Sequence, residues 1–156
     1  MPSKLYLLMS IFAFTLLFGS ANQAFSQSRK AVGATEVNGT FRDYFSGKFK
    51  GNYNEIKILA LGKGKLKVSF GLTYPHIDGT GAMSANVGEA EGEAIIDGDT
   101  AIYSSNEFGA CKITIKFVKP GTIKVDQSGT DSECGFGFNV NASGTYKKTS
   151  GAKPKF

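Results

Sequence analysis

A strict alternation of polar and apolar residues between Lys65 and Tyr74 limits the folds open to this chain more than any other feature. Repetition with a period of two over ten residues predicts a β-strand with one face on the core and the other in water. A helix would need apolar residues at spacings of three and four, which this segment lacks. The expected inward-facing residues are Leu66, Val68, Phe70, Leu72 and Tyr74.

The rest of the chain repeats this pattern in short segments separated by turn residues. Strands are expected at residues 36–41, 55–61, 65–74, 88–96, 100–105, 111–117, 123–125 and 140–146. About eight sequential strands without a convincing helix predict an all-β fold, an antiparallel up-and-down barrel, with a β-sandwich as the alternative. Pairing of the Gly-Thr-aromatic triplets at residues 39–41 and 144–146 would close the barrel and remove its exposed edges.

Two segments bear on what the barrel holds. Residues 75–87 are rich in Gly, Pro, Asp, Asn and Ser, so they are expected to form the longest irregular loop, a type that is often functional. Ala90, Gly92 and Ala94 are expected to face inward and to leave room for bulky neighbours or for a ligand. In the glycine-rich segment 128–138, Phe136 or Phe138 is expected to plug one end of the barrel.

The first residues have the layout of a secretory signal peptide. Lys4 precedes an apolar run at residues 5–18, which is too short for a helix that spans a bilayer. Cleavage is expected before Gln27, with cleavage after Ala21 as the alternative, and an uncleaved anchor is the competing interpretation. The expected organisation is a signal peptide at 1–26, a flexible segment at 27–35, a single barrel domain at 36–148 and a disordered basic tail at 149–156. The mature chain is expected to be secreted or periplasmic, without stable membrane insertion.

The two cysteines and the net charge limit the metal sites and the binding partners that are expected. Cys111 and Cys134 in an exported chain predict one disulfide rather than a metal pair, because His76 is the single histidine. The chain has 18 Lys and Arg against 13 Asp and Glu, a formal net charge of +5. No basic stripe with interleaved aromatics is visible, so nucleic acid is not an expected partner. The mild basicity indicates a solvated face with weak attraction to anionic polysaccharide or lipid headgroups.

Two resemblances add to this interpretation. Residues 54–70 (NEIKILALGKGKLKVSF), residues 85–90 and residues 111–146, followed by two lysines, resemble a group of small exported bacterial β-barrel proteins without assigned function. This resemblance implies compartment and domain identity, not chemistry. The triplet at 39–41 and the strand count are loosely similar to calycin barrels of the lipocalin type, although the chain has no tryptophan. That resemblance implies a basic residue on the last strand, where Lys147 or Lys148 stands.

The residue pattern gives no sign of catalysis or of a cofactor. His76 has no identifiable partner, and Glu89, Glu91 and Glu93 are expected to share a solvated strand face. The first hypothesis is therefore a non-enzymatic exported barrel that binds a small apolar or amphipathic ligand in its interior or at its rim. The expected ligand-binding residues are Phe70, Leu72, Tyr74, Tyr103, Ile115 and Tyr146. The alternative is a protein–protein module, either an inhibitor of a secreted hydrolase or an envelope-associated structural domain, and this alternative requires a filled interior.

Overall fold

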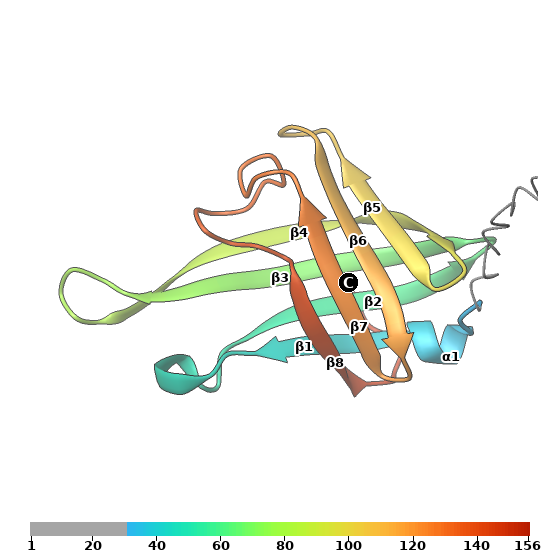
Figure 1. Ribbon diagram of the computed structural model, residues 1–156, viewed down its shortest axis with the longest axis horizontal. Helices are drawn as coiled ribbons and strands as arrows, with labels where there is room; N and C mark the ends of the chain where they lie inside the picture. The colour runs from blue at the N-terminus through green and yellow to red at the C-terminus, as the bar shows by residue number, and fades with distance from the viewer. Residues whose placement is uncertain (1–30) are drawn as a thin grey trace, which may run out of the picture.

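The alternating segment predicted around residues 65–74 is a long strand at the centre of a sheet that closes on itself. In a computed structural model that describes residues 31–156, the eight strands pair antiparallel in sequence order and form a closed barrel (Figure 1). This confirms the predicted all-β, up-and-down architecture. The elements are α1 (Ala34–Val37), β1 (Gly39–Tyr44), η1 (Gly47–Phe49), β2 (Tyr53–Gly62), β3 (Lys65–Ile77), β4 (Met83–Asp97), β5 (Thr100–Ser105), β6 (Cys111–Lys119), β7 (Thr122–Ser128) and β8 (Gly144–Ser150).

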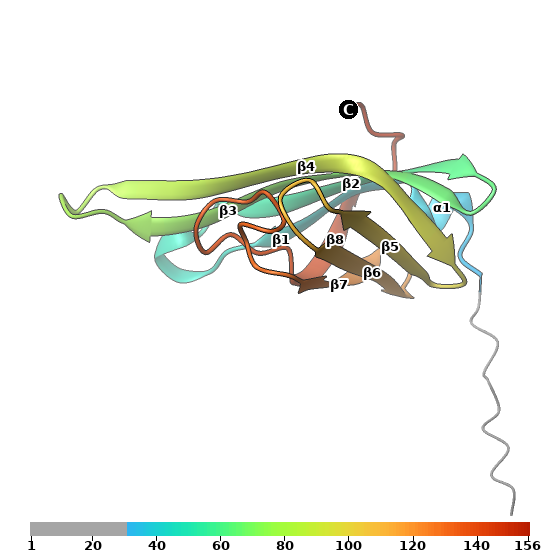
Figure 2. The same cartoon turned by 90° about the horizontal axis from the view of Figure 1, so that it is seen from above.

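The barrel is flattened into two layers, with β1–β4 in one layer and β5–β8 in the other (Figure 2). The layers are joined at two short seams. At one seam, residues 94–97 of β4 pair with residues 100–103 of β5. At the other, β1 pairs with β8, where Phe41 lies opposite Lys148 and Arg42 opposite Lys147. The first and last strands therefore pair as predicted. On β8 the paired residues begin at Lys147, directly after the triplet at 144–146.

The interior is filled with side chains. Inward residues of every strand alternate with outward ones, and the largest fully buried side chains include Tyr146, Phe41, Phe70 and Ile115. The small inward residues of β4 make room for aromatic rings from elsewhere. A Cβ atom on Gly92 would lie 2.8 Å from Cε2 of Tyr103. The space next to β4 is therefore occupied by the protein itself.

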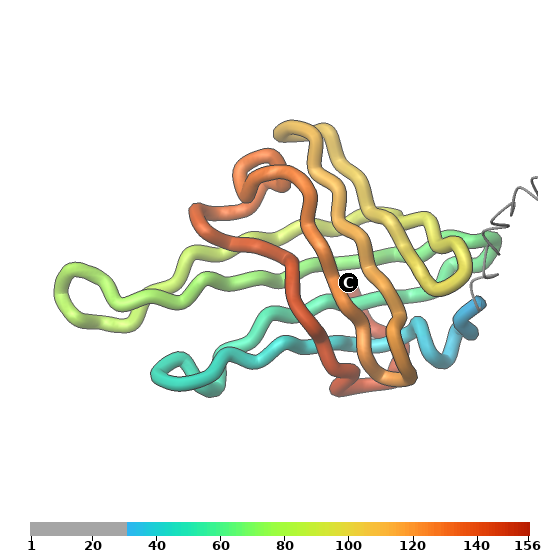
Figure 3. Tube along the Cα trace, viewed as in Figure 1, coloured from blue at the N-terminus to red at the C-terminus, as the bar shows by residue number. Residues whose placement is uncertain are grey.

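Each end of the barrel is covered by a different segment of the chain. At the end next to α1, the ammonium group of Lys148 donates to the carbonyl oxygens of Thr35, Glu36 and Asn38 at 3.0, 2.6 and 2.9 Å. It also lies 5.1 Å from the ring centroid of Phe41. A lysine of the last strand thus holds the N-terminal helical turn over the barrel. Figure 3 shows this turn in blue, just before β1.

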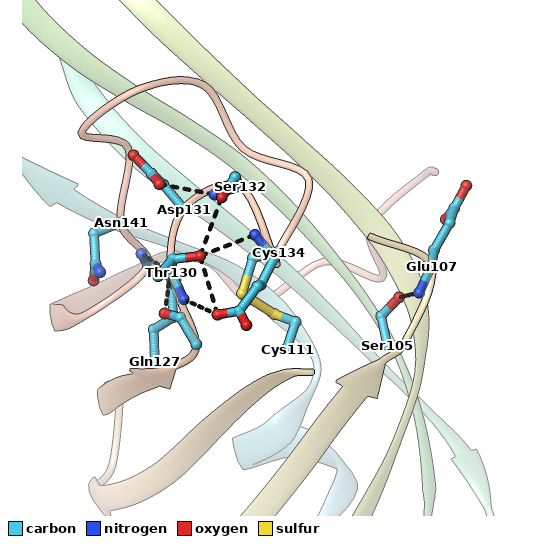
Figure 4. The surroundings of a disulfide bond; sticks show 12 residues. Ser105, Glu107, Cys111, Gln127, Thr130, Asp131, Ser132, Cys134 and Asn141 are labelled. Atoms are coloured by element: carbon cyan, nitrogen blue, oxygen red, sulfur yellow. Dashed lines mark hydrogen bonds between the residues drawn. A yellow bond between two sulfur atoms is a disulfide. The ribbon is translucent and has the colours of Figure 1, made fainter. Parts of the chain in front are cut away.

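At the other end, the segment between β7 and β8 folds over the opening. Phe136 is buried and packs directly on Gly88 of β4, while Phe138 is exposed. The prediction that one of these phenylalanines plugs the barrel is confirmed for Phe136. The predicted disulfide is also present: Cys111 at the start of β6 is bonded to Cys134, with their Cα atoms 4.8 Å apart (Figure 4).

The prediction of an irregular loop at residues 75–87 is wrong. β3 continues to Ile77 and pairs with β4 from Met83, so a turn of only residues 78–82 remains. Asp78 Oδ1 holds this turn by accepting bonds from the amides of Thr80 and Ala82 at 2.8 and 3.0 Å. Pro75 has no N–H to donate, but it does not interrupt the strand. The ladder between β2 and β3 ends at Gly71, so no hydrogen bond of that ladder is lost at Pro75.

Three other expectations about the chain also change. The strand predicted at 36–41 is displaced, because residues 34–37 form α1 and the strand begins at Gly39. β8 extends to Ser150, past the expected domain end at 148. The tail expected to be disordered lies on the outer face of the β1–β4 layer, where Lys57 Nζ donates to the Lys155 carbonyl oxygen at 3.4 Å. The signal peptide expected at 1–26 lies outside the described residues.

Candidate functional site

The structure divides the six residues expected to bind a ligand into two groups. Phe70, Leu72, Tyr103, Ile115 and Tyr146 are all buried in the hydrophobic core. Their side chains fill the interior; the rings of Phe70 and Tyr103, for example, are 5.3 Å apart. Tyr74 does not join them, because β3 has left the barrel at this point and 41% of the residue is exposed.

A small polar cluster lies in the interior at the end of the barrel near Tyr146. The hydroxyl of Tyr146 donates to the Ala142 carbonyl oxygen at 2.8 Å. Burial raises the pKa of Tyr146, the charge of Asp43 adds to the shift, and the Asn54 side chain partly offsets it. Burial also raises the pKa of Asp43, against a hydrogen bond from the Thr145 backbone. These contacts give the buried hydroxyl of Tyr146 and the carboxylate of Asp43 hydrogen-bond partners.

A projecting arm is the most prominent feature outside the core. We use this term for residues 73–87, the part of the β3–β4 hairpin that continues beyond Leu72 and the last β2–β3 pair at Gly71 (left in Figure 1). The arm is anchored at its base. Asn54 Oδ1 accepts a bond from the Thr73 amide at 2.8 Å, and the amide of Gly137 donates to the Val87 carbonyl oxygen at 3.0 Å.

Apolar side chains gather on the outer face of this arm and on the adjoining β1–β2 hairpin. Val87 is 61% exposed and Met83 58% exposed, although both belong to a regular strand. The Tyr44 and Tyr53 rings meet edge to face at 5.5 Å, and Asn52 Nδ2 lies 3.9 Å from Met83 Sδ. We call this set the outer patch; it consists of Tyr44, Tyr53, Ile77, Met83 and Val87.

Two adjoining hollows, of about 450 and 410 Å³, open next to the outer patch. Both are lined by Glu55, Gly71 and Glu89, which lie side by side on β2, β3 and β4. The missing side chain of Gly71 creates the depression, because its neighbours on either strand carry long side chains. Tyr53 and Val87 of the outer patch line the second hollow, so the apolar and the charged surfaces are continuous.

The charges around the hollows follow a regular pattern with one gap. Lys65 pairs diagonally with Glu93 at 2.9 Å, and Lys67 with Glu91 at 2.7 Å. The next position in this series would pair residue 69 with Glu89, but residue 69 is a serine.

Glu55 on the other side of Gly71 is held by Arg42 at 2.7 Å. The hydrogen bonds that the Arg42 guanidinium donates to Tyr44 and Glu55 raise the pKa of Arg42 further above its ordinary value. Among the described residues, Glu89 therefore lines both hollows without a cation of its own.

The segment that covers the barrel end at the base of the arm is tightly organised. Thr130, Asp131 and Ser132 lie near the disulfide in Figure 4. Glu133 Oε2 accepts a bond from the Thr130 amide at 2.7 Å. This bond lowers the pKa of Glu133. Asn86 of the arm donates to the Phe138 carbonyl oxygen at 2.7 Å. The disulfide and these bonds fix the arm relative to the barrel.

Sequence reasoning missed the arm and the hollows. Glu89, Glu91 and Glu93 were expected on one outward face, and this is correct, but the alternation at residues 83–87 was hidden by small and polar residues. The signal that could have revealed the hollow is Gly71, the one glycine in an otherwise alternating strand, since glycine in a strand often marks a close approach or a depression.

Comparisons with known proteins do not assign a site. No family model, curated protein or solved structure matches this chain. Within residues 31–156, no three His, Cys, Asp or Glu side chains lie together in a group that could hold a metal ion. None of the helices in this range has the length and hydropathy to cross a membrane.

Proposed function

We propose that this chain is an exported, non-enzymatic protein–protein module that binds its partner through the outer patch and the adjoining hollows. The observation that carries the proposal is the exposure of Met83 and Val87 on an ordered, anchored arm, together with that of Tyr44 on the adjoining β1–β2 hairpin. A contiguous apolar surface rimmed by charged residues is typical of an interaction site. Aromatic residues and methionine are also enriched where proteins meet.

The hollows suggest the chemistry of the partner. Glu89 has no cation among the described residues, and Glu55 and Glu91 lie next to it. A lysine or arginine side chain of the partner would supply the missing charge, with its apolar stem against Tyr53 and Val87. We therefore infer a partner protein that presents a cationic side chain from an apolar surface.

The filled interior favours this function over the binding of a small ligand inside the barrel. The five expected interior residues pack against each other, and both hollows lie on the outside. A projecting hairpin on a rigid body is also the shape that an inhibitor needs to enter the cleft of a secreted hydrolase. An envelope-associated structural domain would use the same surface with a flatter partner.

The likeness to lipocalin-type barrels remains part of the proposal. It is supported by Lys148, one of the two lysines that could match the basic residue of the last strand in that class. Lys148 lies over Phe41 of the first strand. Secretion and a cleaved signal peptide are likewise inferred, and the disulfide supports an oxidising compartment.

The test compares two substitutions on the same face of the same strand. Val87→Asp lies in the outer patch, whereas Ile95→Asp, at a residue 57% exposed on the same face of β4, lies at the far end of the strand. Each tagged variant is used to capture partners from the exported fraction of its own host, and the affinity for the purified partner is then measured. We expect Val87→Asp to weaken binding at least about tenfold, because a hot-spot residue contributes about 2 kcal/mol or more.

Two results would overturn the proposal. The first is a partner that binds both variants equally well or loses both equally. The second is a small ligand that accompanies the purified protein in native mass spectrometry and disappears on denaturation, which would return the function to ligand binding. Glu89→Gln separates the two parts of the proposal, since it removes the charge but leaves the outer patch intact.

A further inference from the structure

The outer face of β5–β8, which faces the viewer in Figure 1, carries an excess of unpaired positive charge. Its exposed charged residues are Lys112, Lys116, Lys124, Asp126 and Lys147. All four ion pairs found in residues 31–156 involve β1–β4 residues, and these lysines take part in none of them. The outward strand positions of this layer therefore carry four lysines against one aspartate.

Two of these lysines face each other across neighbouring strands. Lys116 and Lys124 are direct partners in the β6–β7 register, and the flanking positions in the same row are Thr100 and Thr145. Like charges placed directly opposite each other destabilise a sheet. The arrangement therefore does not serve the fold, and an anion outside the protein would remove its cost.

The shape of this face indicates what kind of anion it meets. Both hollows lie on the opposite layer, whereas this face is the outer side of the antiparallel sheet formed by β5–β8. Ile102 and Val118 are 39% and 48% exposed on the same face. Lysines with interspersed apolar side chains suit a flat, charged surface with an apolar layer beneath it.

We propose that the outer face of β5–β8 docks on the anionic surface of a lipid bilayer. The ammonium groups of Lys112, Lys116 and Lys124 lie among the lipid phosphates, and Ile102 and Val118 enter the headgroup layer. The arm and its hollows belong to the other layer, so they stay accessible. This inference concerns a different surface from the proposed partner site and does not depend on it.

Vesicle co-sedimentation of the mature protein tests the proposal. The probe is a vesicle of phosphatidylcholine with phosphatidylglycerol, compared with phosphatidylcholine alone. We expect binding to the anionic vesicles, and a large loss of it when the salt concentration rises from about 0.1 M to about 1 M, because the Debye length falls from about 10 Å to about 3 Å. A change of Lys116→Gln together with Lys124→Gln should weaken binding about 25-fold, since each lysine near an anionic surface contributes about fivefold.

Lys48→Gln together with Lys50→Gln is the matched control, because it makes the same change in charge on the loop that carries η1. Equal losses of vesicle binding in both double variants would mean that binding depends on net charge alone. That result would overturn the proposed docking face. Ile102→Ser together with Val118→Ser distinguishes a bilayer from a soluble polyanion. If this variant binds vesicles as well as the wild type does, and dextran sulfate binds the protein equally tightly, the bilayer proposal is wrong.

The same variants provide a check on folding. Because Lys116 and Lys124 repel each other in the free protein, their double replacement should leave the thermal midpoint unchanged or raise it. A lower midpoint together with lost binding would show that the lysines serve the fold, and would also overturn the proposal.

Discussion

Replacement of Lys148 by methionine tests how the N-terminal turn is held on the barrel. The ammonium group donates three bonds, to the carbonyl oxygens of Thr35, Glu36 and Asn38 at 2.6 to 3.0 Å. A single hydrogen bond to a charged group contributes about 1.5–3 kcal/mol. The three bonds share one charge, however, and burial of that charge opposes them, which is why the pKa of Lys148 lies below its ordinary value.

We therefore expect Lys148→Met to lower the free energy of unfolding by about 2–3 kcal/mol, which is close to one such bond rather than three. Methionine keeps an apolar stem over Phe41, so the loss reports the ammonium group rather than packing. Urea unfolding followed by circular dichroism measures the change, with the slope of the transition as a check on two-state behaviour.

The neighbouring lysine provides the control. Lys147 points outward and makes one longer bond, to Thr122 Oγ1 at 3.3 Å. We expect Lys147→Met to cost less than about 0.5 kcal/mol, the usual range for a surface position. If the two variants lose the same free energy, or if Lys148→Met loses less than about 0.5 kcal/mol, the inferred role of Lys148 is refuted.

Three further predictions concern the interior and the disulfide. Gly92→Val should destabilise the protein by about 1–3 kcal/mol, because its side chain would meet Tyr103, and Tyr103→Leu should relieve part of this in a double-mutant cycle. Burial raises the pKa of Asp43, so its charge opposes folding above that pKa and the cost disappears as the pH falls below it. Asp43→Asn should therefore be more stable relative to the wild type at pH 7 than at about pH 3, and an equal difference at both pH values in chemical unfolding would contradict this. Replacement of Cys111 and Cys134 by alanine should cost about 3 kcal/mol, and a loss below about 1 kcal/mol would show that the segment holds without the bond.

One part of the candidate surfaces could be predicted from the periodicity of a single strand, and the other part depends on how several strands pair. The outward positions of Glu89, Glu91 and Glu93 could be predicted, because a strand with a period of two places them on one face whatever it pairs with. The hollow could not, since it requires Glu55, Gly71 and Glu89 on three strands to share one row. Register between strands depends on the turns and on the packing of the whole sheet.

The same distinction separates Tyr74 from the other predicted inward residues. Its alternation is as regular as that of Leu72, but it lies past the end of β2, where no layer remains to cover it. Burial depends on what lies opposite a strand as well as on the strand itself, and the sequence of β3 does not contain that information. The basic face of β5–β8 is a similar case, because its lysines are spread along the chain and meet only in the sheet.

The sequence by itself determined the strand class and the disulfide and favoured a barrel over a β-sandwich, because local alternation, turn residues and paired cysteines act over short distances or leave few choices. Tertiary structure decided the rest. The closure of the sheet turned the small residues of β4 into space for Tyr103 and Phe136, extended the hairpin into an arm and brought Lys116 and Lys124 together on the opposite layer. These outcomes depend on distances between strands far apart in the chain, and only the folded barrel sets those distances.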